Sequence, residues 1–178
     1  HLSIRRQRQM CIRDRVLQHL YWFSECVEKF YNTRYFPSLW AFLRKSGEDI
    51  TTFFLHLLEF SKEYGLFRLA VTQELLNGIL VASLMGRADS SLLVELLAYD
   101  WLRCGQRNLP PCLAAVEGAD KTLKDRLYRE LPPALPGLYD KPGRNRFFKQ
   151  AVFHSFSGSA LRELGFASRG EGCLVFLR

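Results

Sequence analysis

The chain has 178 residues, and its apolar fraction of 48% lies in the range of folded globular domains, which argues against disorder. This length is enough for one domain with a sizeable core, or for a main domain with a small appendage, and we expect one core. The net charge of +7 suggests an anionic partner, but residues 1–15 hold five Arg against Asp14 alone, so residues 16–178 carry only +3.

The first 15 residues, HLSIRRQRQMCIRDR, show no apolar periodic face. They resemble a translated sequencing-adapter read-through of the kind found at the ends of metagenomic gene fragments. We therefore expect residues 1–15 to be a non-native or disordered leader, with the domain beginning at Val16. The alternative is a basic arm that binds nucleic acid or a membrane.

Apolar periodicity, proline and glycine predict five helices over the first two thirds of the chain. In the first helix the apolar stripe contains Val16, Leu20, Phe23, Val27 and Phe30. The expected ranges are 16–31, 37–45 starting at a proline, 50–64 capped by Asp49 and closed by Gly65, 69–84, and a helix from Asp89, Ser90 or Ser91 to Gly105.

The last third is expected to change character. Asp120 is predicted to cap a sixth helix over 121–131, with Leu123 and Leu127 facing inward. Residues 132–143, rich in Pro and Gly, are predicted to be a loop. Residues 144–178 are expected to form a small α+β tail on the helical domain 16–131: a strand over 147–156 that could equally be helical, a short helix over 159–164 and a strand over 173–177. The predicted fold is mainly α, a bundle of about six helices with this tail.

The cysteines do not form a recognisable metal motif, because they contain no CxxC pair and Cys104 and Cys112 are spaced too widely for a zinc knuckle. Their odd number and the absence of a secretory signal favour reduced cysteines in the cytoplasm. The longest apolar-rich stretch, 75–85, is too short to cross a membrane. The five cysteines are Cys11, Cys26, Cys104, Cys112 and Cys173.

Few residues suggest chemistry. His19 and His56 lie in aromatic helices, where a structural role is favoured; His154 lies near the tail without an obvious partner. An enzyme using Asp100 and His154 would require those two side chains to meet in one pocket. No phosphate-binding glycine loop, HExxH motif or nucleophile turn occurs.

The segment AYDWLRCGQRNLPP, residues 98–111, is the most distinctive part of the sequence. Asp100 lies among apolar residues, and an unpaired buried carboxylate is costly. Arg103, one helical turn on, and Arg107, beyond the helix end, are its candidate partners. We favour a structural ion pair there over a docking or substrate contact made by Tyr99, Asp100, Arg103 and Arg107.

Basic and aromatic residues also interleave near residue 146, as in single-strand nucleic-acid binders. Arg144, Arg146 and Lys149 are the best basic patch after residue 15, and three charges give weak non-specific binding at most. A solvated face is favoured, so a nucleic-acid partner is disfavoured, and no membrane partner is expected.

Three segments, VEKFYNTRYF (27–36), TTFFLHLLEFSKEYGL (51–66) and AYDWLRCGQRNLPP, resemble a helical domain of unknown function at the C-terminus of certain cobalamin-binding radical S-adenosylmethionine proteins. The resemblance covers residues 17–178, although the closing CLVFLR lacks the aromatic-rich ending of the family. It implies a parent protein with a 4Fe–4S cluster held by a CxxxCxxC motif, S-adenosylmethionine and cobalamin. No cysteine of this chain matches that motif, so no catalytic, cofactor or metal residue is carried over.

The resemblance implies a non-catalytic accessory domain that packs on the radical S-adenosylmethionine barrel of the same parent polypeptide and helps substrate or domain docking. This reading predicts an exposed apolar or aromatic patch. The alternative is a free-standing helical module that binds nucleic acid or a protein partner, which predicts a contiguous basic stripe and salt-sensitive binding.

Overall fold

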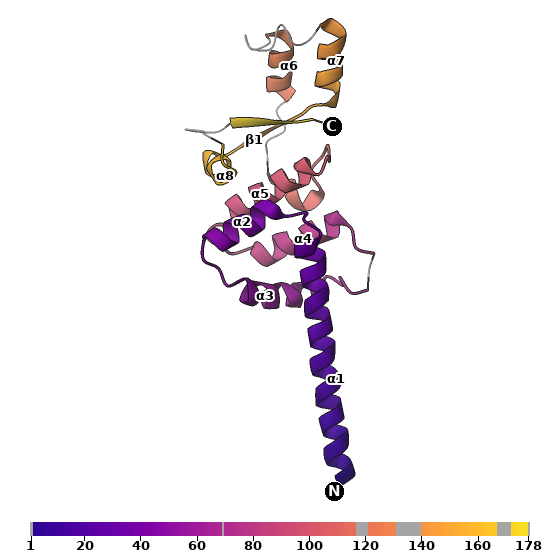
Figure 1. Cartoon of the computed structure of the whole chain (residues 1–178). Coiled ribbons are helices and arrows are strands. Elements are labelled where there is room, and N and C mark those ends of the chain that lie inside the picture. Colours follow the sequence, from indigo (N-terminus) through magenta and orange to yellow (C-terminus); the bar gives the residue numbers. More distant parts are fainter. Residues whose placement is uncertain (1, 69, 117–120, 131–139, 167–171, 178) are drawn as a thin grey trace. The chain divides into compact units, whose positions relative to one another are not determined.

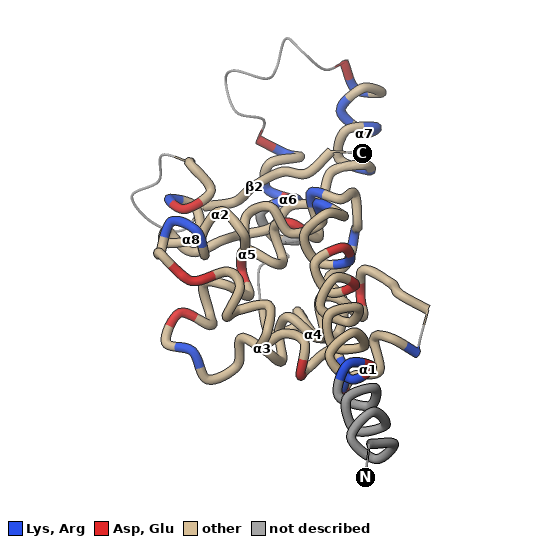
Figure 2. Tube along the Cα trace, turned by 60° about the horizontal axis from the view of Figure 1, so that its bottom comes forward, with Lys and Arg blue, Asp and Glu red and all other residues tan. Residues whose placement is uncertain are grey.

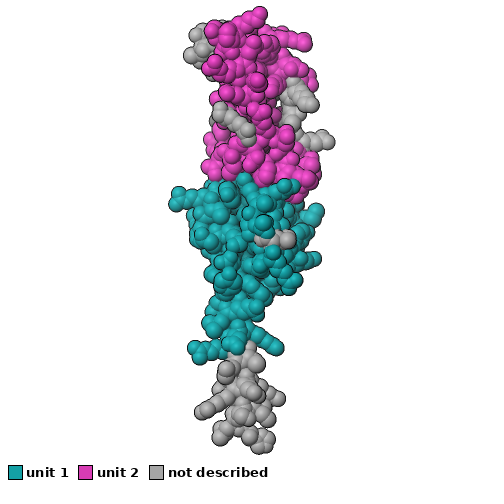
Figure 3. Space-filling model, turned by 90° about the vertical axis from the view of Figure 1, so that its right-hand side faces the viewer, with its two compact units in different colours: residues 1–85 teal, residues 86–178 magenta. Residues whose placement is uncertain are grey.

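The chain is described by a computed structural model for residues 2–68, 70–116, 121–130, 140–166 and 172–177 (Figure 1). It divides into two compact units, His1–Met85 and Gly86–Arg178 (Figure 3). The predicted fold class is confirmed, since the described elements are mainly helices with one small antiparallel sheet near the C-terminus. The boundary between the units, at Met85 and Gly86, falls within the predicted helical domain 16–131. The helix that follows Gly86 in the chain packs against the C-terminal tail and so belongs to the second unit.

Unit 1 holds four helices close to the predicted ranges. The first runs further in both directions: it begins at Leu2, and its last turn is a π-helix, η1. That residues 1–15 are non-native stays a prediction, and their helical continuation in α1 does not test it. The elements are α1 (Leu2–Val27), η1 (Glu28–Asn32), α2 (Pro37–Lys45), α3 (Ile50–Glu63) and α4 (Gln73–Leu84).

The ends of α3 and α4 are set by caps. The Asp49 carboxylate accepts the backbone N–H of Thr51 at 3.0 Å, as predicted, and Gly65 after the helix has a φ of +71°. Helix α4 begins at Gln73 rather than near residue 69, because the Thr72 hydroxyl accepts the N–H of Leu75 at 3.1 Å and so fixes the first turn there.

The core of unit 1 is centred on Trp40 in α2. Its ring stacks on Phe54 at 5.1 Å between centroids and meets Phe53 edge-on at 5.6 Å. Its indole N–H donates to the carbonyl of Phe30 in η1 at 3.0 Å. One side chain therefore ties the end of the first helix to α2 and α3.

Unit 2 begins with α5 (Ser90–Arg103), whose Leu93, Leu96 and Leu97 are buried. Asp89 precedes the helix as predicted, but its carboxylate pairs with Arg87 at 2.9 Å instead of capping the backbone. The 3₁₀ turn η2 (Pro111–Leu113) and α6 (Lys121–Arg129) follow, the latter near its predicted range; its predicted cap, Asp120, and the side chain of Leu123 lie outside the described residues.

The tail differs from the prediction at its start. Helix α7 (Lys141–Gln150) occupies the end of the expected loop and the first half of the expected strand. Pro142 fits in the first turn of the helix, because backbone N–H groups there have no carbonyl acceptor within the helix and proline lacks this N–H. The Asp140 carboxylate caps the helix by accepting the N–H of Gly143 at 2.8 Å. Residues 131–139 of the expected loop lie outside the described residues.

The remaining tail elements are as predicted within a few residues: β1 (Val152–Phe156), α8 (Gly158–Glu163) and β2 (Gly172–Phe176). The two strands pair antiparallel, with His154 opposite Leu174. Phe148 of α7 stacks on Phe153 of β1 at 5.6 Å, and Leu127 of α6 packs against the same cluster. This small core joins α6, α7 and β1.

Trp40 offers a direct test of the unit 1 core. Replacing Trp40 by Ala should lower the free energy of unfolding by about 3–5 kcal/mol, because it removes the stacked ring and leaves the Phe30 carbonyl without its donor. Urea titration followed by circular dichroism measures this change. Leu55→Ala, on the exposed side of α3, is the control and should change stability by about 0.5 kcal/mol or less. Equal losses in both variants would contradict the role given to Trp40.

Candidate functional site

The predicted ion pair at the end of α5 is present. Asp100 is fully buried, and its Oδ1 lies 3.9 Å from Nε of Arg103, whose side chain is 46% exposed. The distance is that of an ion pair rather than a hydrogen bond. Arg103 therefore supplies positive charge beside a carboxylate that has no access to solvent, as the spacing of three residues predicts.

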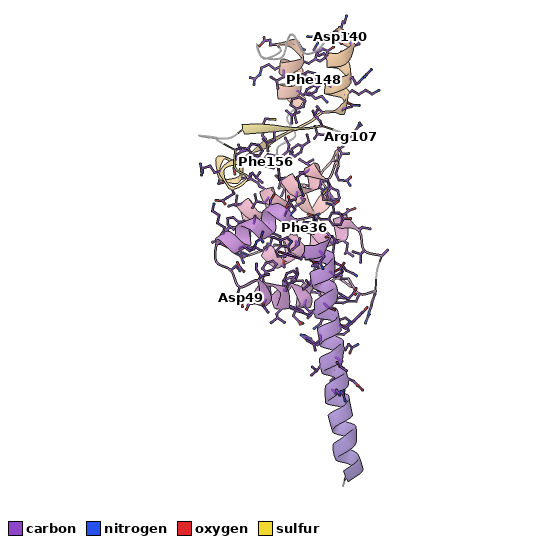
Figure 4. The ribbon with its side chains drawn as sticks, in the orientation of Figure 1. Phe36, Asp49, Arg107, Asp140, Phe148 and Phe156 are labelled. Carbon is purple, nitrogen blue, oxygen red and sulfur yellow. The ribbon has the colours of Figure 1, made fainter. Side chains whose placement is uncertain are left out.

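The loop after α5 is tied to the helix by Trp101. Its indole N–H donates to the carbonyl of Asn108 at 2.7 Å, and Gly105 turns the chain with a φ of +86°. Pro110 is buried at the far end of this loop. Arg107 lies at the exposed tip of the loop (Figure 4). The sequence did not indicate this tether, because Trp101 and Asn108 are brought together only by the turn at Gly105.

Tyr99 lies on another face of α5 and is half-buried among phenylalanines of the tail. Its ring centroid is 6.1 Å from Phe156, 6.5 Å from Phe166 and 5.7 Å from Phe176. Such spacings are those of edge-to-face and tilted aromatic pairs. Of the four predicted site residues, Tyr99 and Asp100 are thus packed inside unit 2, while Arg103 and Arg107 present charge at its surface.

The tail also brings an acid next to His154. Glu95 is one helical turn before Tyr99, and its carboxylate accepts the N–H of Ser157 at 2.8 Å. The Ser157 hydroxyl in turn accepts the N–H of Ala160 and so caps α8. Glu95 is separated from Asp100 by five residues, about 140° around the helix. The acid that the structure sets near His154 is therefore Glu95, which the sequence did not indicate because the two segments are far apart in the chain.

His154 itself is only 2% exposed, and its Nε2 has no hydrogen-bond partner among the described residues. Its ring lies 4.7 Å from that of Phe156. Burial lowers the pKa of His154 because it disfavours the charged imidazolium, and the nearby Glu95 carboxylate opposes this shift by raising the pKa. A neutral imidazole packed against phenylalanine has the surroundings of a structural histidine.

A second candidate surface lies in unit 1, on α1. Val16, Leu17, Leu20 and Tyr21 are each between 52% and 59% exposed, and their spacing places them on one side of the helix over adjacent turns. We call these four residues the α1 apolar face. Val16 and Leu20 continue the predicted stripe, whose later members are covered by unit 1, for example Phe23 by Phe54 at 6.2 Å. The stripe is therefore buried at one end and uncovered at the other.

The residues that the structure describes do not fit an iron–sulfur cluster. In the described part of the chain, no group of three or more His, Cys, Asp or Glu side chains could hold a metal ion. Cys26 is fully buried, and burial raises the pKa of its thiol, which disfavours the thiolate that metals bind. No step of any mechanism is therefore assigned to a metal in this domain.

The chain matches a known family model. Residues 16–164 match a family model described as "Protein of unknown function (DUF4080)". The chain belongs to this family. The match confirms that the chain contains a domain of unknown function, and it includes both the α1 apolar face and α5, whereas β2 lies beyond it. No curated protein and no solved structure matches the chain significantly. Among the described helices, none has the length and apolarity to span a bilayer.

His154 makes the stability of unit 2 pH-dependent. Because burial lowers its folded-state pKa below the ordinary value of 6.5, the unfolded chain binds more protons over the interval between the two values. Lowering the pH from about 8 to about 5 should therefore reduce the free energy of unfolding, and the loss begins near pH 6.5.

Urea titrations across that pH range measure this effect. His154→Gln should remove this part of the pH dependence, whereas His56→Gln, at an exposed position of α3, should leave it in place. A His154→Gln profile that matches the unchanged chain would show that another group is responsible.

Proposed function

We propose that residues 16–164 form a non-catalytic C-terminal accessory domain of a cobalamin-binding radical S-adenosylmethionine enzyme, which packs on the catalytic barrel of the same polypeptide and helps to dock substrate or domains. The observation that carries this proposal is the α1 apolar face. It lies inside the segment that matches the family, so it is part of the domain.

Four neighbouring apolar side chains more than half exposed on one helix are more than the scattered single residues of an ordinary surface. Fully burying a large apolar side chain contributes about 1.5–3 kcal/mol, so covering these four from their half-exposed state would contribute about 1 kcal/mol each. A neighbouring domain of the same chain meets this face at high effective concentration, so a surface of modest size suffices to hold it.

The reactive groups of the parent enzyme belong, on this proposal, to the domains that precede this one. The resemblance implies a 4Fe–4S cluster, S-adenosylmethionine and cobalamin there. The odd number of cysteines favours reduced thiols and a cytoplasmic protein. Of the cysteines in the described part of the chain, Cys26 is buried, Cys104 is exposed, and Cys112 and Cys173 are partly buried. The domain contributes surfaces rather than cofactor ligands.

Any direct substrate contact in unit 2 is assigned to Arg103 and Arg107. Both side chains are exposed, whereas Asp100 is buried. A guanidinium recognises carboxylate or phosphate groups through paired N–H donors. Tyr99 and Asp100 then act by positioning: Tyr99 fixes α5 against the tail, and Asp100 holds the Arg103 side chain near the helix end.

The reading frame upstream of Val16 in the source gene tests the parentage. The proposal expects an open frame that continues upstream and encodes a CxxxCxxC motif within a radical S-adenosylmethionine barrel. An in-frame stop codon followed by a start codon close to Val16 would overturn it.

The docking face is tested in the parent protein that this frame encodes. Leu17→Glu combined with Leu20→Glu should detach the domain, because two carboxylates cannot be buried against an apolar surface without a large penalty. Limited proteolysis then releases the domain at least tenfold faster. The matched control is Leu55→Glu combined with Tyr64→Glu. It places the same two charges at exposed positions, one in α3 and one directly after it. Equal release from both variants would contradict docking through α1.

A further inference from the structure

The positive charge of unit 2 is concentrated on two helices. Together α6 and α7 contain eight Lys or Arg residues and one acidic residue, Asp125, so their net charge of +7 equals that of the whole chain. The flanking Glu130 and Asp140 lower this value only to +5. The sequence indicated only three of these charges as a patch, all of them in α7. The charges of α6 are separated from them in the chain, so the sequence did not show that both helices contribute to one surface.

The fold sets the two helices side by side (Figure 1). The Tyr128 hydroxyl of α6 donates to Oδ1 of Asn145 in α7 at 2.5 Å, and the Arg144 guanidinium lies over the Tyr128 ring at 5.2 Å. Beneath them, Phe148 meets Tyr128 edge-on at 5.3 Å and stacks on Phe153 of β1. We call this pair of helices the basic hairpin. The packing of Tyr128, Phe148 and Phe153 fixes the position of α6 relative to α7.

The Lys and Arg positions of α6 and α7 are coloured along the chain in Figure 2, and most of these charges have no ion pair in the part of the chain that the structure describes. Five of the side chains are exposed and have no ion pair among the described residues: Arg126, Arg129, Lys141, Arg146 and Lys149. The Nε of Arg144 is buried without an acceptor in the described part of the chain. Like charges held at this density repel one another, and a polyanion relieves the repulsion.

We infer that the basic hairpin is a nucleic-acid-binding surface that recognises the phosphate backbone. Four of its eight cations are arginines, whose planar donors suit phosphate, and Tyr128, which is 36% exposed, adds an aromatic side chain to the same surface beside the Arg144 guanidinium. An acidic protein would satisfy the charges but would not use the exposed aromatic ring. This inference does not rest on the proposed parentage, because the chain alone carries the surface.

The test is the binding of a fluorescein-labelled single-stranded RNA of about 16 nucleotides to the full chain, followed by fluorescence anisotropy at about 50 to 200 mM salt. Two variants change the net charge equally. The hairpin variant carries Arg126→Gln, Arg129→Gln, Arg146→Gln and Lys149→Gln. The leader variant carries Arg5→Gln, Arg6→Gln, Arg8→Gln and Arg13→Gln.

We expect the hairpin variant to bind at least tenfold more weakly at low salt and to lower the slope of log K against log salt by about 3, since each neutralised phosphate contributes about 0.7. The leader variant should change the slope by less than about 1. Equal losses in both variants would mean that net charge alone drives binding, and an unmodified chain that does not bind would equally overturn the inference.

A competition arm separates nucleic acid from an acidic protein. Polyglutamate of matched charge should displace the RNA at least tenfold less effectively than unlabelled RNA does. Equal displacement would assign the surface to an acidic protein partner instead. Circular dichroism melting of both variants shows that they remain folded, and the exposed positions of the hairpin substitutions give no reason for them to unfold unit 2.

Discussion

The second unit depends on the packing of Tyr99 in α5 against Phe156 of β1 and Phe176 of β2. This contact sets the two strands against the helix, and the bond from the Ser157 backbone N–H to the Glu95 carboxylate ties the capping residue of α8 to α5. Because α7 leads directly into β1, the same contact also positions the basic hairpin. A side chain that sequence reasoning treated as a candidate contact for substrate is thus the anchor of the tail.

In the first unit the corresponding constraint is the apolar stripe of α1. Its continuation in η1 is covered, with Phe30 fully buried and the Phe30 carbonyl accepting the indole N–H of Trp40, while Val16 and Leu20 in α1 are exposed. A helix of this kind has more apolar surface than its own unit covers. Periodicity alone reveals the face of a helix but not its partner, and it is the uncovered half that points to a docking role.

The sequence predicted the local features well, because caps and breakers act within a few residues. Asp49, Pro37 and Gly65 delimit helices where predicted. The prediction of a loop up to residue 143 was wrong, because α7 already begins at Lys141. Pro142 and Gly143 indicate a loop unless Asp140 is recognised as a helix cap. The long-range features could not be predicted: Glu95 beside His154, and α6 beside α7, are brought together only by tertiary packing. The Asp100–Arg103 pair was predictable because its partners are one turn apart.

The central claim is that the α1 apolar face docks on a preceding domain of the same polypeptide. Hydrogen–deuterium exchange of the α1 backbone amides, compared between this chain and the full-length protein encoded by its gene, tests this claim most directly. The account predicts that residues 16–21 exchange rapidly in the chain alone and become at least tenfold more protected in the full-length protein, while residues of the buried core such as Leu57 keep the same protection. Equal exchange of residues 16–21 in both proteins would contradict it.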